Sequence, residues 1–176
     1  VNSTPVATGT TTSLNYNWNS GSITIGGTNI GSGQRMLVIT GYWQHPGTAG
    51  QSSTVYFVGR NDDGLIVNIN NTQVINDWAQ QGPRYWNSSG SFTGTGGEWY
   101  PIVINWYEWH GSANMDIHYS LSNLSTNSTS GWLDMNNNHF ALTVTPLSAI
   151  STSQQTEVNT AKAVSQTNNK IHLTTS

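Results

Sequence analysis

The sequence predicts an all-β protein, an antiparallel β-sandwich with long loops at one end, and three observations lead to this prediction. Apolar residues recur with a period of two rather than 3.6, which is typical of strands that bury one face. Long turn-rich segments separate the apolar runs, at residues 26–33, 46–53, 80–97 and 123–130. Only 7% of the residues are charged, whereas 8 Trp, 7 Tyr and 3 Phe are available to fill a core.

The length of 176 residues fits one compact domain with a short appendage. Apolar residues become sparse near the C-terminus, so we expect a β-sandwich domain over residues 1–147 and a polar tail or linker over residues 148–176. The first residue is not Met, and we expect the sequence to be part of a larger multidomain chain.

The central strands of the sandwich are predicted by apolar runs. Residues 55–58 and 102–107 are apolar on both faces, as expected for strands that are covered on both sides. Residues 65–69 and 72–78 flank Asn70-Asn71, and asparagine tolerates the positive φ of a tight turn. These two segments are therefore predicted to form a hairpin.

The later strands are predicted by alternation. Met115, Ile117, Tyr119 and Leu121 alternate with polar residues, so we expect one face of this strand in the core and the other in water. A shorter alternation over residues 140–144 predicts a further strand.

Composition excludes several classes of function. The formal net charge is −3 with 5 Lys+Arg, which is too few cations for a protein that binds the phosphate backbone of a nucleic acid. No apolar run approaches the roughly 18 to 20 residues that span a bilayer, so membrane insertion is not expected. The chain has no Cys and therefore no disulfide.

The sequence contains no pattern that predicts an enzyme. A glycosidase needs two separated carboxylates, and a serine hydrolase of the nucleophile-elbow type needs Gly-x-Ser-x-Gly. Asp116, Asp134 and Glu98 lie in separate elements without a motif, and no such elbow occurs. His118 and His139 lie too far apart in the sequence to predict a metal site. We therefore expect a binding protein with no catalytic residues.

The chemistry is expected at Asp62-Asp63, which lies between two predicted strands. Adjacent carboxylates repel each other, and a site that keeps both ionised usually holds a cation. Calcium fits best because the chain has no Cys and its His residues lack zinc-like spacing. A solvated acidic turn is the alternative, and the dipeptide alone does not exclude it.

The surrounding sequence resembles the protective-antigen 14-kDa domain family. The resemblance covers roughly residues 37–121 and rests on blocks that keep their order and approximate spacing: Thr40-Gly41-Tyr42-Trp43, Pro46, residues 55–64 with Asn61-Asp62-Asp63-Gly64, Tyr100-Pro101-Ile102 and Trp106-Tyr107-Glu108. This family is an extracellular β-sandwich shared by anthrax protective antigen, yeast flocculins and bacterial adhesins. The resemblance also implies opening strands within residues 14–30 and a closing strand at residues 140–145.

In sugar-binding members of this family, a cis peptide joins the two aspartates, and both ligate one calcium ion together with a second loop and the sugar hydroxyls. The resemblance therefore implies that Asp62 and Asp63 bind calcium and ligand. It places the second loop after Tyr107 and implies these residues as metal ligands, through carbonyls or side chains: His110, Gly111, Ser112 and Asn114. It further implies sugar contacts from a last group of residues: Trp109, His110, Gln44 and His45.

Four further side chains receive an interpretation. We expect Glu108 to accept local hydrogen bonds in a structural role, and Trp78 to pack against the sheet in the core. Tyr85 and Trp86 are candidates for a second aromatic platform, with simple loop packing as the alternative.

Together these observations predict a calcium-dependent, lectin-like carbohydrate-binding module of a secreted or cell-surface adhesin. Its partner would be a cell-surface glycan or monosaccharide, and its location extracellular. Two alternatives remain open, since fold alone does not fix function. One is a structural or protein-interaction domain of a toxin or surface protein, and the other is an accessory binding module of a secreted glycoside hydrolase.

Overall fold

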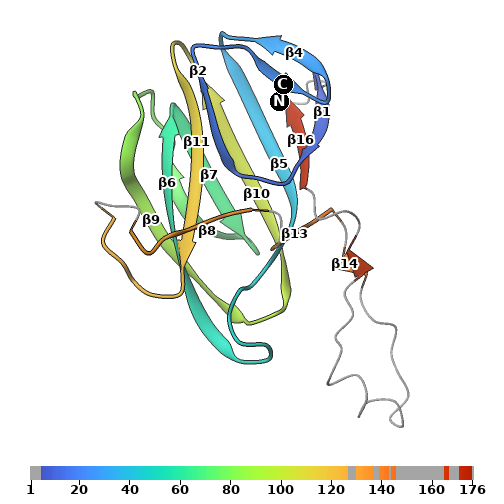
Figure 1. The fold of residues 1–176 in the computed structure, drawn as a ribbon, viewed down its shortest axis with the longest axis vertical. Helices are drawn as coiled ribbons and strands as arrows, with labels where there is room; N and C mark the ends of the chain where they lie inside the picture. The colour runs from blue at the N-terminus through green and yellow to red at the C-terminus, as the bar shows by residue number, and fades with distance from the viewer. Residues whose placement is uncertain are drawn as a thin grey trace.

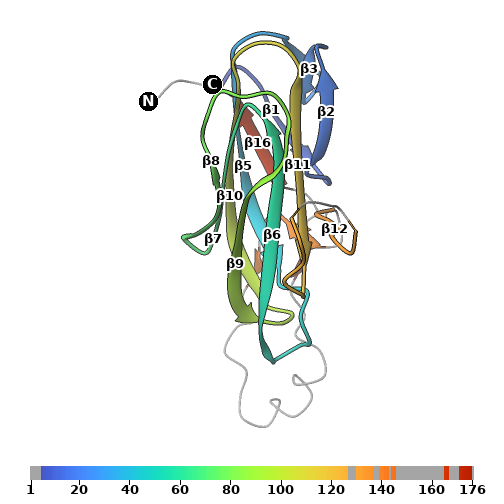
Figure 2. The ribbon, with the colours of Figure 1, turned by 90° about the vertical axis from the view of Figure 1, so that its left-hand side faces the viewer.

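The chain folds into two large antiparallel sheets (Figure 1). The apolar residues that recur with a period of two form the core between them. The computed structural model describes residues 5–126, 130–136, 139–142, 144–145, 165–166 and 171–175. Figure 2 shows the sandwich from its edge, with β5 and β10 in one layer and β11 and β2 in the other. The predicted fold class, an antiparallel β-sandwich, is confirmed.

The first sheet is built around β10, which pairs with β5 on one side and β7 on the other. Within the described residues its order is β1 (Thr8–Thr11), β16 (Ile171–Thr175), β5 (Arg35–Gln44), β10 (Trp99–Glu108), β7 (Gly64–Ile69) and β8 (Thr72–Asp77), and β13 (Phe140–Ala141) also pairs with β5. The register places Glu108 opposite Arg35 at one end of this sheet, and Trp99 opposite Gln44 at the other end.

The second sheet has β6 and β11 at its centre, paired from Asn114 opposite Asp62 to Ser120 opposite Tyr56. Its order is β12 (Leu133–Asp134), β11 (Ala113–Ser120), β6 (Ser52–Asp62) and β9 (Arg84–Thr95), and β2 (Asn15–Asn19) also pairs with β11. Two small hairpins accompany the sheets: β3 (Ile23–Ile25) with β4 (Thr28–Gly31), and β14 (Val144–Thr145) with β15 (Ser165–Gln166). The expected strand over residues 140–145 is thus divided between β13 and β14.

Large aromatic side chains fill the space between the sheets. Trp43, Phe57, Trp106 and Phe140 are fully buried. The ring of Trp43 meets Phe57 edge-on with 5.4 Å between the ring centroids. Burying one large apolar side chain contributes about 1.5 to 3 kcal/mol, so these aromatic residues stabilise the sandwich without disulfides.

The predicted hairpin at Asn70-Asn71 is confirmed. Both asparagines have positive φ, 47° and 64°, and they join β7 to β8. Two residues with positive φ form the turn whose twist matches that of the flanking strands. The end of β8 is thereby brought beside the end of β6, where the acidic pair lies.

The C-terminal residues correct the predicted domain boundary. Residues 148–176 were expected to form a polar tail, but β16 (Ile171–Thr175) lies between β1 and β5 and completes the first sheet. In the sequence, this strand has only two alternating apolar residues, Ile171 and Leu173, within a stretch rich in Thr and Asn. Pairing on both edges supplies hydrogen bonds that the sequence pattern does not reveal.

The turn-rich segment at residues 80–97 also differs from its prediction. Most of it is the long strand β9 (Arg84–Thr95), which pairs with β6 at the edge of the second sheet. A Cβ added to Gly90 would lie 2.4 Å from the backbone oxygen of Val74 in β8. Glycine is therefore required for the close approach of two strands, although it is usually typical of loops.

Strand β11 is buried on both faces rather than on one. Met115 and Ile117 face the core as predicted, but His118 is also buried because the segment after β11 folds back over the outer face of the sheet. In that segment, Trp132 packs against Val58, the cross-strand partner of His118. Leu121, which was expected in the core, lies beyond the strand and is exposed.

The two predicted central strands differ in how they are covered. β6 is buried on both faces at Phe57 and Val58, as expected. β10 buries Ile102 and Ile104 but exposes Val103 on its outer face. Among the described residues, no helix is long and apolar enough to cross a membrane.

Candidate metal and ligand site

The acidic pair lies where the two sheets meet at one end of the sandwich. Asp62 is the last residue of β6, Gly64 begins β7, and Asp63 lies between these strands. The peptide bond between Asp62 and Asp63 is cis, which confirms the expectation from the family resemblance. Asp62 and Asp63 are 4% and 3% exposed, so the alternative of a solvated acidic turn is excluded.

Backbone donors from two loops hold the carboxylate of Asp63. The N–H of Gln81 donates to Oδ1 at 2.7 Å, and the N–H of Trp109 donates to Oδ2 at 2.6 Å. Hydrogen bonds from N–H groups to an ionised carboxylate are stronger than those between neutral groups. Asp63 therefore fixes the positions of the loops that follow β8 and β10.

Side chains of β6 and β10 hold the backbone around the pair. The amide of Asn61 donates to the carbonyl of Asp63 and, at 3.2 Å, to Oδ2 of Asp77. The indole N–H of Trp106 donates to the carbonyl of Asp62 at 3.2 Å. The acidic pair is thus anchored to β8 and β10 by buried polar contacts.

Glu108 supplies a third carboxylate and was not predicted to belong to the site. Ligand oxygens of Asp62, Asp63 and Glu108 all lie within 4.8 Å of one another. Glu108 is 3% exposed, and neither of its carboxylate oxygens has a hydrogen-bond partner among the described residues. The expectation that Glu108 accepts local hydrogen bonds is therefore wrong.

Burial and repulsion by neighbouring carboxylates raise the pKa values of Glu108 and Asp62. Burial, together with the charges of Asp63 and Asp62, raises the pKa of Glu108 to about 7. Burial and the charge of Asp63, opposed by Arg60, raise the pKa of Asp62 to about 6. An uncompensated buried charge is costly, so the cluster favours a bound proton or cation.

The donor atoms at this site suit a hard cation. The three carboxylates offer only oxygen, and the carbonyl oxygens of nearby backbone could complete a shell of the kind that calcium takes. Asn114 lies opposite Asp62 in the register, and its Oδ1 is buried with no hydrogen-bond partner in the part of the chain that the structure describes. Two unpartnered oxygens on Glu108 and one on Asn114 are the observations that fit a metal site.

The second loop predicted from the resemblance follows β10 directly. Trp109 contacts Asp63 through its backbone N–H. His110, Gly111 and Ser112 are exposed, and none of the hydrogen bonds found for the described residues joins them to the aspartates. Their predicted role as metal ligands remains a proposal, and Asn114 is the member of this group that is buried beside the acidic pair.

A cleft adjoins the carboxylates. It has a volume of about 550 Å³, and Glu108 and Trp109 form the edge that it shares with the acidic cluster. The ring of Trp78 meets the ring of Tyr107 edge-on at 4.6 Å between the ring centroids. Trp78 was expected in the core but is 44% exposed and lines this cleft, because β8 is the edge strand of its sheet.

Gln44 and His45 lie at the opposite end of the sandwich, which corrects their expected position near the acidic pair. Gln44 pairs with Trp99, whereas Glu108 pairs with Arg35 at the other end of β5 and β10, about 30 Å away at about 3.3 Å per residue. The ring of His45 is 1% exposed and bonds to the carbonyl of Ser53 and the N–H of Gly47. Burial lowers its pKa, and its role is structural.

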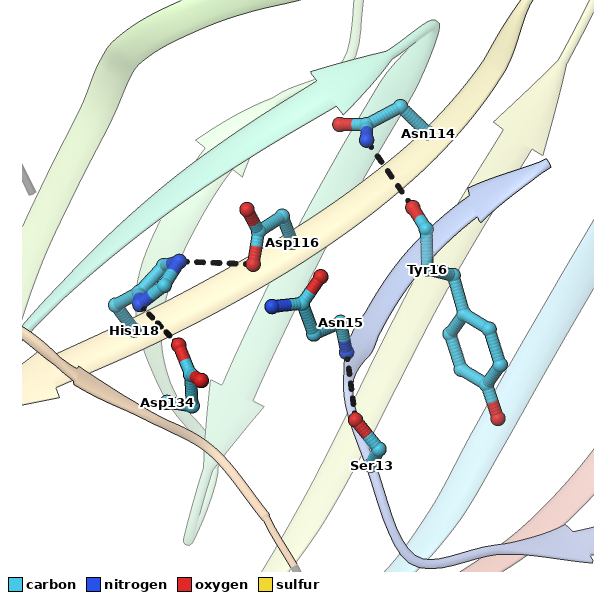
Figure 3. A network of polar contacts seen from close by, with 7 residues as sticks. All are labelled: Ser13, Asn15, Tyr16, Asn114, Asp116, His118 and Asp134. Atoms are coloured by element: carbon cyan, nitrogen blue, oxygen red, sulfur yellow. Dashed lines mark hydrogen bonds and ion pairs between the residues drawn. The ribbon is translucent and has the colours of Figure 1, made fainter. Parts of the chain in front are cut away.

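His118 belongs to a second polar cluster, on the outer face of β11. Its ring lies between Asp116, with Nε2 2.8 Å from Oδ1, and Asp134, with Nδ1 2.9 Å from Oδ1 (Figure 3). One ring nitrogen of His118 and one carboxylate oxygen from each of Asp116 and Asp134 lie within 4.8 Å of one another, so this trio is a second group that could hold a metal ion. This cluster joins β12 to β11. The ring of His139 packs instead against Tyr119, at 5.9 Å between the centroids.

Tyr85 and Trp86 belong to β9, and their side chains lie outside the described part of the structure. Their prediction as an aromatic platform is not tested. Among the residues that line the site, the sequence did not indicate Glu108, Trp78 or Gln81. The sequence offered one indication for Glu108. Acidic residues are rare in this chain, which has only 8, and Glu108 directly follows a predicted strand.

Comparison with solved structures identifies the fold. The chain is similar to a PA14 sugar-binding domain from an RTX adhesin, with a TM-score of 0.57 and 19% identity over 74% of this chain and 75% of that chain. It is also similar to the PA14 domain of the MpAFP antifreeze protein, with a TM-score of 0.55 and 14% identity over 75% of this chain and 71% of that chain.

A third similar structure is an anti-sigma factor domain-containing protein from Clostridium clariflavum, with a TM-score of 0.57 and 13% identity over 79% of this chain and 42% of that chain. No family model and no curated protein matches the sequence. At these identities the likeness establishes a PA14-type fold and leaves function to the chemistry of the site.

Proposed function

We propose that the chain is a calcium-dependent carbohydrate-binding module of the adhesin type, which recognises extracellular glycans. The observation that carries this proposal is the convergence of three buried carboxylates within 4.8 Å at the edge of an aromatic-lined cleft. Within the described ranges, the two carboxylate oxygens of Glu108 accept no hydrogen bond. One structural neighbour is a sugar-binding domain from an RTX adhesin, which supports the same function.

Different residues of this chain bind the ion and contact the sugar. Asp62, Asp63 and Glu108 provide negative charge and oxygen ligands, and the buried bonds to Asp63 keep the loops in place. Calcium accepts 6 to 8 oxygen ligands in flexible geometry, so vicinal hydroxyls of a sugar can take positions on the ion. The exposed ring of Trp109 then offers an aromatic face to the C–H surface of the sugar.

Paired variants test the proposal. Asp62→Asn removes one charged ligand and should abolish both calcium binding and glycan binding, measured by calorimetry and by a glycan array with and without chelator. Trp109→Ala should weaken glycan binding and leave calcium affinity unchanged. Glu98→Gln removes a carboxylate near His45, at the opposite end of the sandwich, and should change neither. Glycan binding that survives in Asp62→Asn would refute the mechanism.

A structural role for the ion is the second candidate, and the bonds of Asp63 favour it. Its two oxygens each hold a different loop through Gln81 and Trp109, so a cation at this position could serve only to brace the loops of a protein-interaction domain. In that case calcium would bind and raise the melting temperature, but no member of a glycan array would bind.

A further inference from the structure

A second group of metal-ligating side chains lies on the outer face of the second sheet, outside the acidic cluster. Asp116 and His118 are two residues apart in β11, so their side chains point to the same face. β12 pairs with β11 and places Asp134 directly opposite His118. Val58, the partner of His118 in β6, lies four residues before Asp62, which is about 13 Å along the strand at about 3.3 Å per residue. This group is therefore distinct from the proposed calcium site.

The three side chains already lie close to the distances that a shared metal ion requires. Nε2 of His118 is 2.8 Å from Oδ1 of Asp116, and Nδ1 is 2.9 Å from Oδ1 of Asp134 (Figure 3). Two ligands of one tetrahedral zinc ion lie about 3.4 Å apart, because each bond is about 2.1 Å long. The side chain of Asp134 is 53% exposed and free to adjust. A small shift of this carboxylate can bring one atom from each residue onto one ion.

Burial distinguishes this group from a surface ion pair. The side chains of His118 and Asp116 are 7% and 15% exposed. Oδ1 of Asp116 is buried, and none of the described residues donates a hydrogen bond to it. Trp132 packs against Val58, the cross-strand neighbour of His118, and supplies apolar cover beside the group. Buried polar atoms normally have a partner, and a bound cation would be the partner of this oxygen.

The donor set favours a transition ion such as zinc over calcium. The group offers one imidazole nitrogen and two carboxylate oxygens. Imidazole suits zinc, copper and nickel, whereas calcium takes 6 to 8 oxygen ligands. Zinc sites with three protein ligands of this kind keep a further position for water. Arg60 lies opposite Asp116 in the register and offsets one negative charge, so we expect moderate rather than extreme affinity.

A cleft gives the group access to solvent. It has a volume of about 430 Å³, and Asp134, Asn136 and His139 are among the residues that line it. Asp134 thus belongs both to the group and to the wall of the cleft. A metal site needs such an entry path as well as suitable ligands.

We propose that Asp116, His118 and Asp134 form a second metal site, which binds zinc or a similar divalent transition ion through one imidazole nitrogen and two carboxylate oxygens. The ion joins β12 to β11 and thereby fixes the segment after β11 to the outer face of the sheet. The site is independent of the proposed glycan binding. The sequence did not indicate it, because Asp134 reaches His118 only through the pairing of β12 with β11.

The test is a calorimetric titration of zinc chloride into metal-stripped protein at pH 7.5, where imidazole is largely neutral and able to bind a metal. The wild type should bind one zinc ion at this group, and its melting temperature should rise with zinc concentration. Asp134→Asn removes a charged ligand at a half-exposed position that the fold should tolerate. This variant should bind zinc at least about tenfold more weakly, since even residues that only orient metal ligands contribute about 10- to 100-fold.

Controls separate this site from the acidic cluster and from adventitious binding by exposed histidines. The Asp62→Asn, Asp63→Asn double variant should keep the zinc affinity of this group, and His110→Gln, which removes an exposed imidazole, should also keep it. Cobalt(II) is a second probe, because its visible absorption reports a nitrogen ligand. This absorption should change in His118→Gln and persist in His110→Gln.

Three results would overturn the proposal. The first is absence of zinc binding in the double variant, which would place the ion at the acidic cluster. The second is unchanged zinc affinity in both Asp134→Asn and His118→Gln. The third is absence of zinc binding in the wild type, which would leave a proton shared between His118 and the two aspartates as the only link between β12 and β11 in this group.

Discussion

Replacing Glu108 by glutamine should stabilise the metal-free protein at high pH and not at low pH. Burial and the neighbouring aspartates raise the pKa of Glu108 from 4.5 to about 7 in the fold. The folded protein therefore holds a proton that the unfolded chain releases. This contribution to stability is complete below about pH 4.5 and is lost as the pH rises through about 7.

The size of the effect follows from this pKa. At 1.36 kcal/mol for each pKa unit, the rise from 4.5 to about 7 corresponds to a cost of about 3 kcal/mol for the ionised group. Glu108 borders an open cleft, and water there screens the charge, so we expect about 1 to 2 kcal/mol. For a chain of this length, that free energy raises the melting temperature by about 3 to 6 °C.

The assay is thermal unfolding of metal-stripped wild type and Glu108→Gln from pH 4.5 to pH 8.5. Groups outside the acidic cluster titrate alike in both proteins, so the difference between the two melting temperatures reports Glu108 together with its repulsion from Asp62 and Asp63. The variant should melt higher at pH 8 and within about 1 °C of the wild type at pH 4.5. A variant that is less stable than the wild type at pH 8 would show that the ionised carboxylate makes stabilising hydrogen bonds, and our description of the cluster would be wrong.

Two further predictions concern the scaffold. Gly90→Ala should destabilise the protein by about 1 to 3 kcal/mol because the new Cβ meets backbone of β8, whereas Gly82→Ala, which has open space around it, should change stability by less than about 0.5 kcal/mol in chemical denaturation. Both aspartates that contact His118 can be tested in the same denaturation assay, and Asp116→Asn should lower the free energy of unfolding more than Asp134→Asn. The side chain of Asp116 is 15% exposed and that of Asp134 is 53% exposed, and exposed ion pairs contribute less than about 1 kcal/mol. An equal loss of stability in the two variants would contradict this order.

Sequence patterns predicted those parts of the fold that depend on residues close together in the chain. The alternation at Met115 and Ile117 and the turn at Asn70-Asn71 depend on neighbours in sequence, and the structure confirms both. The buried outer face at His118 and the strand β16 depend on segments that are distant in the chain. The sequence around a covered residue does not indicate which distant segment will cover it, so the buried outer face and β16 were not predicted.

The site was predicted in part for the same reason. Asp62 and Asp63 are adjacent, and their chemistry is visible in the dipeptide. Glu108 joins them only through the register of β10 with β7, and Trp78 reaches the cleft only because β8 is an edge strand. The expected position of His45 was wrong because it came from a resemblance, whereas the register of β5 places it at the far end of the sheet.

The most direct test of the account is a calorimetric calcium titration of metal-stripped protein at pH 7.5, with the Asp62→Asn, Asp63→Asn double variant measured in parallel. The account predicts one binding site in the wild type, a melting temperature that rises with calcium concentration, and neither effect in the double variant. Absence of binding in the wild type, or equal binding in the double variant, would contradict the assignment of the acidic cluster as the calcium site.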